Sequence, residues 1–171
     1  MHEKEKKIKQ VQQEVIKELP LLMALEKSSK KPYETSTFRG IKGMQTAIYE
    51  VLSELKERDE ILAMGIRSSK KEHYNLLWEK WHQERIRKKI SCRVIFSDKN
   101  TEYFRKFQTM RFTEIKILQG ITPSAIDIMK DKVLIFTYGE EPFCVSIYNP
   151  EIAQSLRTFF ETLWKIAKKR L

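Results

Sequence analysis

Apolar and polar residues follow each other along this chain with two different periods, one typical of helices and one typical of strands. Apolar residues spaced three and four apart predict helices over 41–58, 71–89, 100–109 and from 150 to about 168. Apolar or alternating runs predict strands over 33–40, 60–66, 91–97, 113–119, 124–130, 132–139 and 142–149. The sequence therefore predicts an α/β domain.

The lengths of the connections predict how these strands pair. Helical stretches separate the first four strands, and a parallel neighbour needs a crossover of that kind. The last three strands are separated only by short breaks at Lys130-Asp131 and Glu140-Glu141, which favours antiparallel pairing. Asn149 can cap the last helix, with Pro150 at its first position. We expect a mixed sheet with that helix docked on it.

The N-terminal segment has a different pattern from the rest. Residues 1–27 predict an amphipathic helix, 28–35 a polar linker, and 36–171 the α/β domain. Pro20 must kink or interrupt the helix. A narrow apolar stripe suits a seam between two identical helices, although packing on its own domain is an equal alternative. The candidate dimerisation residues are Ile8, Val11, Val15, Leu19 and Leu22.

The composition limits the classes of binding partner and the cellular compartment, but it identifies no single partner. The formal charge of +10 favours a polyanion, a membrane surface or an acidic partner, but it equally serves solubility. Cys92 and Cys144 have no partner at metal or redox spacing, so we expect buried free thiols in a reducing cytoplasm. Because no apolar run approaches the ~20 residues of a spanning helix, we expect a cytoplasmic protein without membrane contact.

The usual signatures of enzyme chemistry are missing from the sequence. The five glycines form no phosphate loop, and no histidine follows a predicted strand as a candidate base. His73 and His82 are nine residues apart and are expected at the surface, not at a metal. Asp98 and Asp127 are expected in turns or on a solvent face, and the basic run 84–89 at the end of a helix. We expect no catalytic residue, metal or cofactor.

A ligand would bind at one predictable place. Open α/β sheets bind ligands beyond the carboxyl ends of their strands. That location makes an anion or small molecule the expected effector, and the alternative is that Ser68 or Ser69 only caps the following helix. The candidate ligand-binding residues are Arg67, Ser68, Ser69, Ser97 and Ser124.

The order of these segments resembles the effector domain of archaeal TrmB-like transcriptional regulators. The resemblance rests on "YETSTFRGIKGMQTAIYEVLSE", "DEILAMGI", "ERIRKKISCRVIFSD" and "VLIFTYGEEPFCVSIYNPEIAQSLRTFFETLWKIAK", and it covers roughly Leu19 to Lys168. It implies a phospholipase D-like fold. Members typically begin with a winged helix-turn-helix, and this sequence starts at the coiled coil. DNA contact is therefore expected only through a winged-helix domain outside this chain.

The same resemblance bears on catalysis. Catalytic members of the phospholipase D group carry His-x-Lys-x4-Asp before a strand. With Asp131 aligned to that aspartate, Ser124 takes the histidine position and Ile126 the lysine position. Neither can attack or bind a phosphate. We expect a non-catalytic, homodimeric effector-sensing domain of a regulator, with a basic nucleic-acid-binding module or a degenerate phosphodiesterase as alternatives.

Overall fold

The computed structural model describes residues 16, 18, 33–99, 101–120 and 124–168. The chain divides into two units, Met1–Pro32 and Tyr33–Leu171, and the division falls inside the predicted linker. In the first unit, Ile16 and Glu18 are helical and exposed. All five candidate dimerisation residues lie outside the described residues, so the dimerisation helix stays a prediction.

Within the described residues, seven strands form one sheet in the order β1-β7-β6-β5-β2-β3-β4. β2, β3 and β4 pair in parallel and β5, β6 and β7 pair antiparallel, as predicted. The expected parallel pairing of the first strand was wrong, because β1 pairs antiparallel with β7; β2 and β5 are also antiparallel. β1 runs in the same direction as β2 but lies at the sheet edge beside β7. The strands are β1 (Glu34–Arg39), β2 (Glu60–Ile66), β3 (Ser91–Phe96), β4 (Thr113–Ile117), β5 (Ala125–Met129), β6 (Lys132–Tyr138) and β7 (Pro142–Tyr148).

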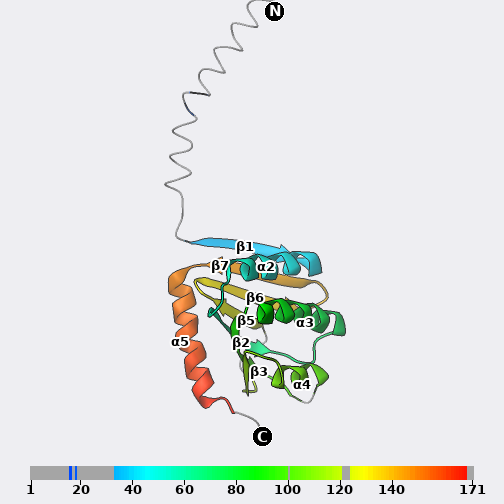
Figure 1. The fold of residues 1–171 in the computed structure, drawn as a ribbon. Helices are drawn as coiled ribbons and strands as arrows, with labels where there is room; N and C mark the ends of the chain where they lie inside the picture. Colours follow the sequence, from blue (N-terminus) through cyan, green and yellow to red (C-terminus); the bar gives the residue numbers. More distant parts are fainter. Residues whose placement is uncertain (1–15, 17, 19–32, 100, 121–123, 169–171) are drawn as a thin grey trace, which may run out of the picture. The chain divides into compact units, whose positions relative to one another are not determined.

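Helices cover both faces of the sheet, so the second unit has three layers (Figure 1). α2 (Gly40–Glu54), α3 (Glu72–Arg87) and α4 (Glu102–Gln108) lie on one face, and α5 (Pro150–Ile166) lies on the other. Successive side chains of a strand point to opposite faces. In β2, Ile61 and Ala63 therefore join the core under α2, α3 and α4, whereas Leu62 and Met64 join the core under α5.

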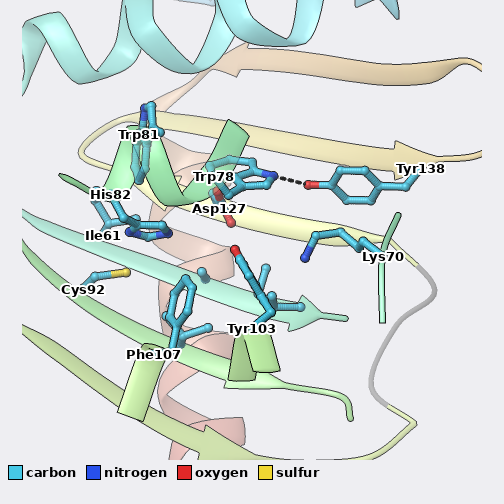
Figure 2. A pocket seen from close by; sticks show the side chains of 13 residues that line it. Ile61, Lys70, Trp78, Trp81, His82, Cys92, Tyr103, Phe107, Asp127 and Tyr138 are labelled. Carbon is cyan, nitrogen blue, oxygen red and sulfur yellow. Dashed lines mark hydrogen bonds between the residues drawn. The ribbon is translucent and has the colours of Figure 1, made fainter. Parts of the chain in front are cut away.

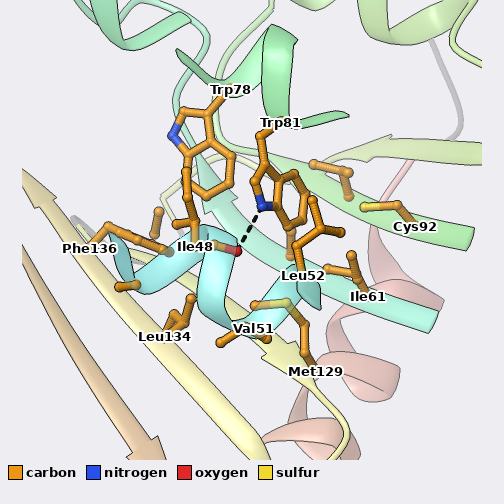
Figure 3. Close-up of a cluster of buried hydrophobic side chains, with 14 of the residues drawn as sticks. Ile48, Val51, Leu52, Ile61, Trp78, Trp81, Cys92, Met129, Leu134 and Phe136 are labelled. Carbon is orange, nitrogen blue, oxygen red and sulfur yellow. Dashed lines mark hydrogen bonds between the residues drawn. The ribbon is translucent and has the colours of Figure 1, made fainter. Parts of the chain in front are cut away.

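Two tryptophans of α3 organise the larger core (Figure 3). Trp78 and Trp81 are buried and contact each other edge to face, with ring centroids 5.3 Å apart. The indole Nε1 of Trp81 donates a hydrogen bond of 2.9 Å to the carbonyl oxygen of Ile48, which joins α3 to α2. The helix predicted over 71–89 is therefore confirmed.

α5 is fixed at its start and along its length. The Asn149 side chain accepts hydrogen bonds from the backbone N–H groups of Glu151 and Ile152, at 2.9 and 3.1 Å, as expected for an N-cap before Pro150. Arg93 of β3 then binds Glu161 of α5 through two N–H···O contacts of 3.0 and 2.6 Å. None of the helices among the described residues is long and apolar enough to span a membrane.

His82 and Asp127, which we expected at the surface or in a turn, are buried, so those two expectations were wrong; Arg85 of the basic run 84–89 is buried as well. Arg85 is fully buried, His82 is 6% exposed and Asp127 is 4% exposed. Arg85 lies inside because its guanidinium reaches the carbonyl oxygens of Ile90 and Phe112, at 2.6 and 3.0 Å, where β3 and β4 begin. Asp127 lies inside because β5 is a central strand covered on both faces.

Candidate functional site

One edge of the sheet collects the segments in which we predicted a ligand site. The carboxyl ends of β2, β3 and β6 meet there with the amino end of β5, as the pairing of Met64 with both Ile95 and Ile126 requires. The predicted ligand residues at 67–69, 97 and 124 all belong to this edge. Arg67 is exposed, Ser97 bonds the carbonyl oxygen of Ile66, and Ser124 is half-buried.

The two serines after β2 already hold a carboxylate. The backbone N–H of Ser68 donates to Asp98 at 2.6 Å, and the Ser69 hydroxyl donates to the other carboxylate oxygen at 2.7 Å. Burial alone would raise the pKa of Asp98, but these hydrogen bonds lower it below its usual value. The N-cap of α3 is Lys71, without a side-chain cap, so the alternative in which Ser68 or Ser69 caps this helix is wrong.

Beneath this edge lies a small cavity between the sheet and helices α3 and α4 (Figure 2). Its volume is about 20 Å³, enough for one water molecule. Aromatic rings of α3, α4 and β6 form a large part of its wall, and polar groups reach it from several elements. It is lined by Ile61, Ala63, Ile66, Lys70, Trp78, Trp81, His82, Cys92, Val94, Tyr103, Phe107, Asp127 and Tyr138.

Asp127 of β5 is the unusual group in this cavity. The residue is 4% exposed, and its Oδ1 atom has no hydrogen-bond partner among the described residues. Burial raises the pKa of the Asp127 carboxyl to about 7, although the nearby charge of Lys70 acts in the opposite direction. A buried carboxyl without a donor is costly, which marks this position as a candidate binding group.

Lys70 brings a cation to the same cavity from the segment between β2 and α3. Its Nζ atom lies 4.5 Å from the centre of the Tyr103 ring and 5.5 Å from that of Tyr138, and it donates to the carbonyl oxygen of Arg67. Burial lowers the pKa of Lys70 to about 8, while the charges of Asp98 and Asp127 act to raise it. The ammonium of Lys70 therefore loses its proton at a lower pH than the ammonium of an exposed lysine.

Hydrogen bonds fix two further rings of the wall. The indole Nε1 of Trp78 donates to the Tyr138 hydroxyl oxygen at 2.7 Å. Arg85 Nε donates to His82 Nδ1 at 3.0 Å, so that nitrogen accepts and carries no proton. Burial, with the charges of Arg85 and Lys70, lowers the pKa of His82 well below its usual value. His82 is therefore neutral near pH 7.

Lys70, Tyr103, Asp127 and Tyr138 were not predicted from the sequence as one group. A signal existed for Asp127, since a single acid in the alternating apolar run 125–129 shares a sheet face with Ala125 and Met129. No such signal existed for Lys70. Its connection between β2 and α3 reaches the cavity only in the folded structure, and its local sequence does not predict this.

The positions aligned with the phospholipase D motif lie apart in the structure. Ser124 precedes β5, whereas Asp131 is exposed in the turn after it. Ile126 packs with the core under α5, on the face opposite the cavity. The cavity is therefore distinct from the aligned motif.

Comparisons with known proteins show similar folds at low sequence identity. TrmBL2, described as an archaeal chromatin protein with a novel mode of DNA binding, matches 99% of this chain at 16% identity and a TM-score of 0.55; the chain spans 66% of that protein. NucT from Helicobacter pylori matches 81% of this chain and 99% of its own, at 10% identity and a TM-score of 0.64. Nuc from Salmonella typhimurium, a phospholipase D family member, matches 81% of this chain and 98% of its own, at 9% identity and a TM-score of 0.56. No family model and no curated protein matches the sequence. The fold is therefore phospholipase D-like.

Proposed function

We propose that this chain is the non-catalytic dimerisation and effector-sensing part of a TrmB-like transcriptional regulator. The observation that carries the proposal is the likeness to TrmBL2, which extends over 99% of this chain, including the N-terminal segment. The likeness to NucT and to Nuc covers 81%. A domain preceded by the predicted N-terminal helix fits a regulator better than a stand-alone enzyme.

The residues at the aligned motif support the absence of phosphodiesterase chemistry. Ser124 has no imidazole with which to attack phosphorus, and Ile126 has no charge with which to stabilise a phosphate. His82 is neutral, buried and bonded to Arg85, so it does not replace the missing histidine. The buried Asp127 carboxyl, which lacks a hydrogen-bond donor at Oδ1, instead supports a role in binding a small effector.

Sedimentation equilibrium of the full chain tests the dimer. We expect twice the 20.5 kDa of one chain, and conversion to monomer when Val11→Asp and Val15→Asp are combined. The matched control combines Gln10→Asp and Gln13→Asp, which add the same charges away from the apolar stripe and should leave the dimer intact. An unchanged mass in the valine variant would remove the N-terminal helix from the proposal.

Direct binding of nucleic acid is a second candidate function, favoured by the net charge of +10 and by the DNA binding of TrmBL2. Fluorescence anisotropy with a labelled DNA duplex tests it. Binding through phosphate contacts should weaken steeply between about 50 and 200 mM salt. Affinity that is absent or indifferent to salt would eliminate this candidate.

A further inference from the structure

We infer that the cavity between α3, α4 and the sheet is a binding site for the primary ammonium group of a small molecule, and that Lys70 of the chain itself fills it. The site rests on the proposed effector-sensing role only for its purpose in the cell, because it would hold the effector that the domain senses. The binding site itself is argued from Lys70, Asp127, Tyr103 and Tyr138.

The wall of the cavity has the chemistry of an ammonium site. Aromatic faces attract cations within about 6 Å of the ring centroid, and the Lys70 Nζ atom meets this condition with both Tyr103 and Tyr138. The hydrogen bond from Trp78 holds the Tyr138 ring in place. Asp127, which lacks a hydrogen-bond donor among the described residues, supplies the counter-charge from the floor of the cavity (Figure 2).

Lys70 also lines the cavity, but its ammonium behaves as an occupant of the site that Tyr103, Tyr138 and Asp127 form. Its ammonium hydrogen-bonds the carbonyl of Arg67, in the same short connection between β2 and α3. That connection is held to the sheet edge by Asp98, through Ser68 and Ser69. If these bonds open, the connection and the ammonium leave together, and the two rings and the Asp127 carboxyl remain on α4, β6 and β5.

The size of Lys70 defines the ligand class. Beyond Cβ, its side chain consists of three methylene groups and an ammonium, and the space left beside it is about 20 Å³. A linear primary amine of similar length therefore fits, whereas a branched or quaternary ammonium does not. An anion is disfavoured because the unpaired carboxylate of Asp127 would repel it.

Thermal unfolding of Lys70→Ala in the presence of n-propylammonium chloride tests the site directly. This amine replaces the atoms that the substitution removes. We expect it to raise the Tm of Lys70→Ala in a concentration-dependent manner, by several degrees once its concentration exceeds the Kd about a hundredfold. Equal concentrations of 1-propanol, tetramethylammonium chloride and sodium chloride should produce no comparable rise.

Two comparisons distinguish specific binding of the ammonium group from nonspecific filling of the space that the Lys70 side chain leaves. Adding Asp127→Asn to Lys70→Ala should remove most of the stabilisation by the amine, because the counter-charge is lost. The wild-type protein should respond more weakly than Lys70→Ala, since its own lysine competes. Stabilisation by 1-propanol equal to that by the amine, or an amine effect that survives Asp127→Asn, would overturn the inference.

Hydrogen exchange on the wild-type protein tests the same site without requiring that Lys70→Ala folds. Displacement of Lys70 by an amine should release the connection, and the backbone amides of Ser68 and Ser69 should exchange several-fold faster. The amides of Trp81 and His82 in the middle of α3 serve as the internal reference. Unchanged exchange at Ser68 and Ser69 under a saturating amine concentration would contradict the inference. Either negative result leaves the dimer test untouched, so failure of the ligand class and failure of the regulator proposal are distinguishable.

Discussion

Replacing Asp127 with asparagine should change how the stability of the protein depends on pH. The carboxyl has a usual pKa of 3.8, and burial raises the pKa to about 7 in the folded state. Between these values the folded state keeps a proton that the unfolded state has lost. Stability from this group is therefore complete below pH 4 and is lost as pH rises to 7.

The size of the effect follows from the shift. Each pKa unit corresponds to about 1.4 kcal/mol, so a shift of about three units corresponds to about 4 kcal/mol of stability lost between pH 4 and pH 8. His82 acts in the opposite direction, because its lowered pKa makes stability rise with pH up to its unfolded value. Lys70 changes the slope only above pH 8, the pKa to which burial lowers it.

Urea unfolding of wild type and Asp127→Asn at a series of pH values isolates the carboxyl, because His82 and Lys70 are common to both proteins. The stability of the wild type relative to the variant should fall by about 1.4 kcal/mol for each pH unit between 4 and 7, and then level off. Asp131→Asn, exposed in the turn after β5, corrects for the loss of one carboxylate. A difference that is constant over this range would refute the assignment of Asp127 as a buried, unpaired carboxyl.

Three further substitutions test the supports of the fold. Arg85→Met should lower the free energy of unfolding by about 3 kcal/mol in urea titrations, because the carbonyls of Ile90 and Phe112 lose their donor; an unchanged value would contradict this. Arg93→Met should lower the free energy of unfolding by about 2 kcal/mol, and Arg93→Lys should lower it less, because only the guanidinium binds both Glu60 and Glu161 bidentately. Equal losses in the two variants would contradict this reason. Asp98→Ala should accelerate amide exchange at 68 and 69 while leaving α5 unchanged, and protection that persists would contradict the role of these bonds.

The elements of the second unit could be predicted because each has a strong local signal. β2 is almost completely buried and reads as a continuous apolar run, and α5 carries its own cap at Asn149. The predicted strands agree with the structure apart from their ends. The neighbour of β1 could not be predicted, because pairing with β7 joins segments more than a hundred residues apart and depends on the whole sheet.

The candidate site was only partly predictable from the sequence. The edge of the sheet follows from strand direction, so Arg67 and Ser97 were correctly placed near each other. The use of Ser68 and Ser69 to hold Asp98 could not be foreseen, since these residues are about thirty positions apart. The alternation of 125–129 places Asp127 on the same sheet face as Ala125 and Met129, but a polar residue is usually exposed, so its burial was not predicted.

Hydrolysis of bis(4-nitrophenyl) phosphate by the purified chain, with and without a chelator, tests the central claim that this phospholipase D-like domain is not catalytic. We expect nitrophenolate release at the rate of the buffer alone between about pH 5 and 9, the range in which acidic and basic side chains catalyse such reactions. Wild type, Asp131→Ala and Asp127→Asn should be indistinguishable. Turnover that co-purifies with the wild-type protein and is lost in either variant would contradict the claim, because it would place reacting groups on this chain.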